Sequence, residues 1–143
     1  APSANKVIGW NQSANALQVG QFLEGRVPRM LHPGLPSHPQ HALALRQMTV
    51  PGAVLTFQVD DAPAMATQLA QRLQCIHYAF SLGHQRSLVV LLRTDEMMAS
   101  TYDLHGAALA DYRRYAGDGV FRLSIGLESA ADLIADLDQA LVA

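Results

Sequence analysis

Short apolar runs rich in β-branched and aromatic residues alternate with segments of helical periodicity along the chain, and this alternation is what most constrains the fold. The connections between them are short. No internal repeat, low-complexity tract or long linker divides the 143 residues. We therefore predict a single α/β or α+β sandwich in which helices cover one sheet.

The apolar runs place the predicted strands, and apolar residues repeating every three or four positions place the predicted helices. Strands are expected at 27–31, 53–59, 77–80, 87–92 and 121–127. Helices are expected at 13–24, 38–47, 62–74, 109–115 and 130–141. Ser37, Asp60 or Asp61, and Ser129 are expected to act as N-caps, the last with Asp132 in the capping-box position.

Charge and cysteine content exclude several classes of function. The formal net charge is −2, so nothing predicts binding to nucleic acid or to an anionic membrane. No apolar run is long enough to cross a membrane, and the first ten residues do not resemble a signal peptide. Cys75 is the only cysteine, which excludes an internal disulfide and favours a reducing, cytoplasmic setting.

Two groups of residues could carry chemistry, but a structural interpretation is favoured for each. His32, His38 and His41 lie in a proline-rich turn and the start of a helix, with no acidic or cysteine ligand nearby, so no metal site is predicted. Cys75 lies close to His77, and a Cys–His nucleophile is the alternative to a buried structural cysteine. The chain has no G-x-G-x-x-G, P-loop or G-x-S-x-G motif.

A third candidate is Arg122 together with Ser81. Arg122 lies inside an otherwise apolar predicted strand, and Ser81 directly follows another. An arginine in such a strand must point to solvent or hold a buried anion. Its planar guanidinium suits a carboxylate, which it can bind through two parallel hydrogen bonds. The structural alternative is an exposed arginine or an ion pair with an aspartate.

Two motifs indicate a family. Residues 32–41, His-Pro-Gly-Leu-Pro-Ser-His-Pro-Gln-His, are followed by Arg46-Gln47-Met48. Residues 118–128, Asp-Gly-Val-Phe-Arg-Leu-Ser-Ile-Gly-Leu-Glu, lead into Asp132–Leu137. Shorter matches lie at 15–16, 21–23, 80–83 and 87–89. From residue 13 onward the chain resembles the C-terminal domain of the Cys/Met-metabolism enzymes that depend on pyridoxal phosphate (PLP). These include cystathionine γ-lyase, methionine γ-lyase, cystathionine γ-synthase and the homoserine sulfhydrylases.

The resemblance implies a fold-type-I enzyme whose C-terminal domain is a small, mostly antiparallel sheet covered by helices. It also implies that Arg122 binds the substrate α-carboxylate, with Ser81 beside it. Fixing the carboxylate sets the angle between the bond to be broken and the cofactor ring. Phe80 stands at a position that resembles a specificity site, where an apolar residue favours an uncharged substrate arm, as in methionine or homocysteine. The chain departs from the family at Arg86, usually glutamate, at His84, usually glycine, and over 91–98.

In the family, PLP is bound through a lysine of a larger N-terminal domain. Lys6 is the only lysine here and is not expected to be catalytic. We therefore expect residues 1–12 to be an extension or linker, residues 13–143 to be the substrate-carboxylate domain, and the PLP-binding domain to be absent from this chain. No PLP is expected to bind this chain alone. The parent is expected to be a cytoplasmic homo-oligomer, a tetramer, acting on a sulfur-containing amino acid.

Three hypotheses about function follow from the resemblance. The first is a fragment of a PLP-dependent carbon–sulfur lyase, similar to methionine or cystathionine γ-lyase. The second is a γ-replacement enzyme, such as a homoserine sulfhydrylase or cystathionine γ-synthase. The third is a stand-alone, non-catalytic module that binds amino acids or a partner subunit.

Overall fold

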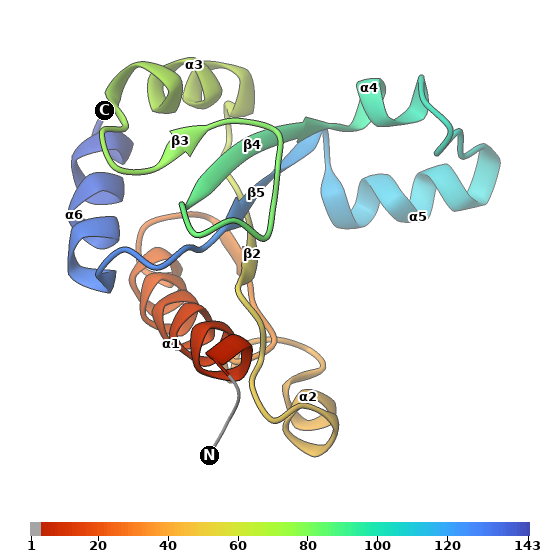
Figure 1. The fold of residues 1–143 in the computed structure, drawn as a ribbon. Helices are drawn as coiled ribbons and strands as arrows, with labels where there is room; N and C mark the ends of the chain where they lie inside the picture. Colours follow the sequence, from red (N-terminus) through yellow and green to blue (C-terminus); the bar gives the residue numbers. More distant parts are fainter. Residues whose placement is uncertain (1–3) are drawn as a thin grey trace.

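The computed structural model describes the backbone of residues 4–143 and the side chains from residue 11 onward. Helices and strands alternate as predicted (Figure 1). The helices are α1 (Ala4–Glu24), α2 (His41–Gln47), α3 (Ala62–Arg72), α4 (Thr94–Met98), α5 (Gly106–Ala116) and α6 (Ala130–Leu141). The strands are β1 (Arg29–Leu31), β2 (Val54–Gln58), β3 (His77–Tyr78), β4 (Leu88–Arg93) and β5 (Gly119–Ser124). None of the helices in this part of the chain is long and apolar enough to cross a membrane.

The five strands form one sheet in the order β1-β2-β5-β4-β3. Neighbouring strands run antiparallel, except that β3 is parallel to β4. The predicted class, a small and mostly antiparallel sheet with helices against it, is therefore confirmed. The central strand β5 pairs along its whole length with β4 and over residues 121–124 with β2, so its residues are held more firmly than those of the edge strands.

The hydrophobic core lies between the sheet and three of the helices. Phe57 on β2 and Phe121 on β5 stack with ring centroids 5.0 Å apart. Apolar residues of α1, α3 and α6, such as Leu23, Leu69 and Leu137, are fully buried in the same cluster. In Figure 1 these three helices gather on one side of the sheet, while α4 and α5 extend away from one end of it. In the part of the chain that the structure describes, side chains on the other face of the sheet therefore have no layer of helices over them.

The first helix is longer than predicted. It begins at Ala4 rather than Ser13, so its backbone continues through most of the segment that we expected to be an extension or linker. No proline interrupts this stretch, and a single glycine, Gly9, costs a helix only about 1 kcal/mol. The side chain of Lys6 lies outside the described residues.

Several other boundaries differ from the prediction by a few residues, among them the start of α2. The helix expected at 38–47 begins at His41, and its N-cap is Gln40, without a side-chain capping bond. Pro39 disfavours helical backbone at the residue before it, and the Ser37 hydroxyl bonds Glu24 instead of capping. The short helix α4 was not predicted. The N-caps Asp61 and Ser129 are confirmed, since each accepts a hydrogen bond of 3.1 Å from the backbone N–H three residues on.

His32 is buried in the turn that follows β1. Its side chain links this turn to the segment that leads into β2. Its Nδ1 accepts a hydrogen bond from the backbone N–H of Gly34 at 3.3 Å, and its Nε2 lies 3.1 Å from the carbonyl of Gly52. Since Nδ1 accepts, Nε2 carries the proton and donates, and the ring is neutral. Gly34 is required here because a Cβ would lie 2.7 Å from the Pro51 side chain.

This arrangement predicts a stability that depends on pH. Burial lowers the pKa of His32 below its ordinary value of 6.5. As the pH falls below 6.5 the unfolded chain binds the proton first, so the folded state loses stability. Urea midpoints at about pH 7.5 and about pH 5.5 should differ more for the wild type than for His32→Asn. Equal differences in the two proteins would show that His32 does not carry the effect.

Candidate functional site

Arg122 projects from the centre of the sheet on the face opposite the core. Its neighbours on β5, Phe121 and Leu123, are buried in the core, so the alternation of a strand directs Arg122 the other way. Thr56 on β2 and Val90 on β4 lie opposite it in the register and share its face. The predicted strand therefore places the half-buried side chain of Arg122 on the face of the sheet that the described helices do not cover.

The contacts of Arg122 bring together the three residues that the sequence singled out. Its Nη2 donates a 3.1 Å hydrogen bond to the main-chain carbonyl of Ser81. The ring of Phe80 lies against the guanidinium, with 5.0 Å between its centroid and Cζ. The Nε–H is buried and has no hydrogen-bond partner among the described residues. Within the described part of the chain, no carboxylate forms an ion pair with Arg122.

The loop that carries Phe80 and Ser81 is held to β5 by hydrogen bonds from its main-chain atoms to side chains of the strand. The N–H of Gly83 donates to the hydroxyl of Ser124 at 3.1 Å, two residues beyond Arg122 on the same face. Gly83 has a φ of +77°, a conformation in which glycine is favoured. These contacts fix the loop relative to the guanidinium.

A partly buried polar cluster supports the end of this loop, and the sequence did not lead us to predict it. Glu128 accepts hydrogen bonds from the backbone N–H and the hydroxyl of Ser87, at 2.7 and 2.8 Å. Ser87 in turn accepts from the N–H of Gly126 at 2.8 Å, and Asn15 on α1 donates to the Glu128 carbonyl at 2.7 Å. A Cβ on Gly126 would lie 2.3 Å from the Gln85 carbonyl oxygen, so these two backbone segments pack directly against each other. The sequence did contain a signal for this cluster, because its residues lie in or beside the segments that resemble the family.

The histidines of the proline-rich segment form local hydrogen bonds. Nδ1 of His38 accepts from the N–H of Gln40 at 3.1 Å, and Nδ1 of His41 lies 2.8 Å from the Pro33 carbonyl. Among the described residues, no three side chains of the metal-binding types are placed to share an ion. The imidazole rings of His38 and His41 therefore stabilise turns through these hydrogen bonds, as the ring of His32 does.

Cys75 is not arranged as a nucleophile. It packs against the hydrophobic core. Burial raises the pKa of its thiol, and the nearby carboxylates of Glu128, Asp136 and Asp132 raise it further, which disfavours the thiolate. The Nε2 atom of His77 is contacted by Arg86 rather than by the sulfur. The arrangement agrees with the structural interpretation.

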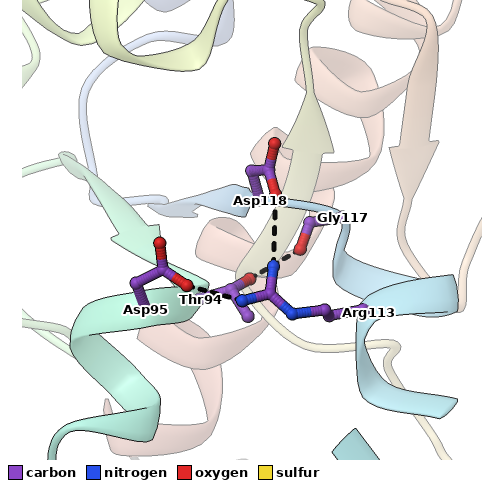
Figure 2. Close-up of polar contacts among 5 residues, drawn as sticks. All are labelled: Thr94, Asp95, Arg113, Gly117 and Asp118. Atoms are coloured by element: carbon purple, nitrogen blue, oxygen red, sulfur yellow. Dashed lines mark hydrogen bonds and ion pairs between the residues drawn. The ribbon is translucent and has the colours of Figure 1, made fainter. Parts of the chain in front are cut away.

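A second polar network lies at the far end of the sheet, where α4 and α5 meet β5 (Figure 2). Arg113 bridges Asp95 and Asp118, at 2.5 and 3.2 Å, and the Thr94 hydroxyl donates to the Gly117 carbonyl at 2.7 Å. The adjoining hollow, about 550 Å³, is lined by both arginines and aspartates. Because its charges are already paired or mixed, this network is best explained as the anchor of α4 and α5.

Three comparisons place the chain among known proteins. The family model described as "Cys/Met metabolism PLP-dependent enzyme" matches residues 10–142. L-methionine gamma-lyase of Pseudomonas deceptionensis is 37% identical over 91% of this chain and 32% of its own length. Cystathionine gamma-lyase of Bos taurus is 39% identical, over 90% and 31%. O-succinylhomoserine sulfhydrylase of Mycobacterium tuberculosis is 38% identical, over 92% and 32%.

The backbone agrees with these matches. Cystathionine gamma synthase from Xanthomonas oryzae pv. oryzae, solved in complex with cystathionine, superimposes with a TM-score of 0.76 at 32% identity. The alignment covers 95% of this chain and 34% of that protein. The chain therefore spans about one third of the length of the proteins it matches.

Proposed function

Because the chain belongs to the Cys/Met metabolism PLP-dependent enzyme family, we propose that it is the substrate-carboxylate domain of a PLP-dependent carbon–sulfur lyase. The substrate class is a sulfur-containing amino acid. Arg122 binds its α-carboxylate, and Ser81 lies beside the bound group.

The observation that carries this proposal is a half-buried arginine with no acidic partner among the described residues. A guanidinium has five N–H donors, and Arg122 uses one of them, on Nη2, for the Ser81 carbonyl. A charge in this position needs a counter-ion. A carboxylate supplied by the substrate would provide it and would accept two of the remaining donors.

The binding of the carboxylate has a direct chemical consequence. Arg122 is on the central strand and its guanidinium is fixed by the loop at residues 80–83, so a bound carboxylate would be oriented as well as held. Orientation of the reacting amino acid is one of the largest contributions that a protein makes to catalysis. Pyridoxal phosphate, when bound, supplies the electron sink for the substrate carbanion.

Residues 11–143, whose side chains the structure describes, do not themselves fit that cofactor. A Schiff base needs a lysine amine, and residues 11–143 contain none. In our proposal the cofactor and its lysine belong to the part of the parent protein that corresponds to the other two thirds of the relatives. The tetrameric assembly and the cytoplasmic setting expected from the resemblance stay predictions.

Phe80 favours an uncharged substrate arm, and we therefore propose methionine or homocysteine as the preferred substrate type. The sulfhydrylase among the relatives keeps γ-replacement as the second candidate. Both reactions need the same grip on the α-carboxylate, so Arg122 does not separate them.

Product analysis with the full-length protein separates the candidates. With L-methionine or L-cystathionine, a lyase is expected to release a thiol, ammonia and a 2-oxo acid. Formation of a new thioether from an O-acylhomoserine and a thiol, with no release of ammonia, would instead establish replacement. Failure of all three substrates, together with binding of free amino acids in calorimetry, would favour the non-catalytic module.

A further inference from the structure

We propose that Phe80 is a positioning residue for Arg122, because its ring stacks on the guanidinium and holds the N–H edge toward the carboxylate. This role differs from the expected contact of Phe80 with the substrate arm. It rests on the proposed function of Arg122 as the carboxylate ligand.

The first observation is where the Phe80 ring lies. A phenylalanine normally buries its ring in the core, but this side chain is 75% exposed and is not part of the core cluster. The contact that does order it is with Arg122, whose guanidinium carbon Cζ lies over the ring, 5.0 Å from its centroid. A flat cation over an aromatic ring is a favourable arrangement, and arginine stacks in this way most often.

The second observation is how few contacts restrain the guanidinium. Apart from the bond between Nη2 and the Ser81 carbonyl, no hydrogen bond of Arg122 is found among the described residues, and its Nε has no partner. One hydrogen bond leaves the plane of the group free to turn about that bond. The stacked ring removes this freedom, and ordering the group before the ligand arrives strengthens binding.

The third observation is that main-chain atoms of the loop bond side chains of β5 and so anchor the backbone that carries the ring. Ser81 uses its carbonyl oxygen, so the bond to Arg122 does not depend on the serine side chain. The Gly83 N–H bonds the Ser124 hydroxyl, which anchors the loop to the strand that carries Arg122. The ring and the cation are therefore attached to one rigid unit.

The ring closes one direction of approach to the guanidinium. With one face of the guanidinium covered by Phe80, an anion binds best in the plane, at the edge that carries the free N–H groups. The ring also excludes water from that face, which strengthens the charge interaction. A carboxylate of any amino acid benefits equally, whatever its arm.

The experiment uses the full-length enzyme with its cofactor and a probe that has no arm. Acetate is tested as a competitive inhibitor of Phe80→Ala, Phe80→Leu, Phe80→Tyr, Arg122→Ala and the double variant Phe80→Ala/Arg122→Ala. The values of kcat/KM are measured with two substrates of different arms. Leu82→Ala is the matched control, because Leu82 is an exposed apolar residue of the same loop.

We expect Phe80→Ala and Phe80→Leu to raise the inhibition constant of acetate about five-fold and to lower kcat/KM for both substrates by a similar factor. Phe80→Tyr and Leu82→Ala should resemble the wild type. In the Arg122→Ala background, removing Phe80 should have no further effect on acetate inhibition, because its action on the carboxylate passes through the arginine.

An unchanged acetate constant in Phe80→Ala, or a Phe80 effect that persists without Arg122, would overturn this proposal and favour a contact with the substrate arm. Such a result leaves the role of Arg122 intact. If Arg122→Ala itself changes neither acetate inhibition nor kcat/KM, the proposed function fails with it, so the two failures are distinguishable.

Discussion

Replacement of Arg122 by alanine in the full-length enzyme is expected to lower kcat/KM for its amino-acid substrate by about 10²- to 10³-fold. Truncating one partner of a buried, hydrogen-bonded charge pair costs roughly 2–5 kcal/mol, and each 1.4 kcal/mol is a factor of ten. The expected change is a large rise in KM with a smaller fall in kcat, because a poorly held substrate is also poorly oriented. Steady-state kinetics measure both.

Two control variants make this result specific. Arg122→Lys keeps the charge but not the planar pair of donors, so partial activity is expected. Arg93→Ala removes an exposed arginine at the end of the adjacent strand β4, where it lies 3.6 Å from Glu96, and should leave the kinetics unchanged. Wild-type kinetics for Arg122→Ala would refute its role in carboxylate binding.

Replacement of Asp136 by alanine is expected to destabilise the fold by about 3 kcal/mol, since it leaves three backbone N–H groups, that of Ile76 buried, without their charged acceptor. Asp136 is buried on α6, and the three consecutive backbone N–H groups of residues 74–76 donate to it at 2.8–2.9 Å. The carboxylate thereby ties the end of α3, and the chain leading into β3, to the last helix. Urea unfolding followed by circular dichroism measures the loss.

Asp138 on the same helix provides the comparison. It pairs with Arg26 at 2.5 Å, but both side chains are about half exposed. Exposed ion pairs contribute roughly 0–1 kcal/mol, so Asp138→Ala should be nearly neutral. Equal losses in the Asp136 and Asp138 variants would contradict the assignment of Asp136 as an anchor.

The carboxylate of Asp136 also makes the stability of the fold sensitive to acid. Burial alone would raise the pKa of Asp136, but the three backbone N–H groups and the Gln139 amide outweigh it, and the pKa lies below its ordinary value of 3.8. The stability it contributes is therefore present above pH 3.8 and is lost as the pH falls through the lowered pKa. The pH range in which Asp136 affects stability therefore lies below the pH range in which His32 affects it.

The sequence predicted most of the sheet, because each strand is an apolar run with clear turns around it. The length of α1 and the existence of α4 were missed. A five-residue helix such as Thr94–Met98 spans less than two turns, too few for periodicity to show. The late start of α2 was predictable, since Pro39 restricts the residue before it.

For the site, the sequence identified Arg122 and Ser81 as candidate residues, but it did not predict the contact between them. An arginine in an apolar strand predicts an anion or solvent, and the absence of an acidic partner depends on tertiary packing. The stacking of Phe80 joins segments far apart in the chain, so no local pattern indicates it. Asp136 did leave a signal, because it lies on the same helical stripe as Leu133 and Leu137.

The most direct test is a crystal structure of the full-length protein with an unreactive amino-acid analogue of the substrate. We predict that both oxygens of its α-carboxylate lie about 2.7–2.9 Å from the Arg122 guanidinium, the range for charge-assisted hydrogen bonds. A carboxylate held by other residues, or an acidic side chain from elsewhere in the protein paired with Arg122, would contradict the account.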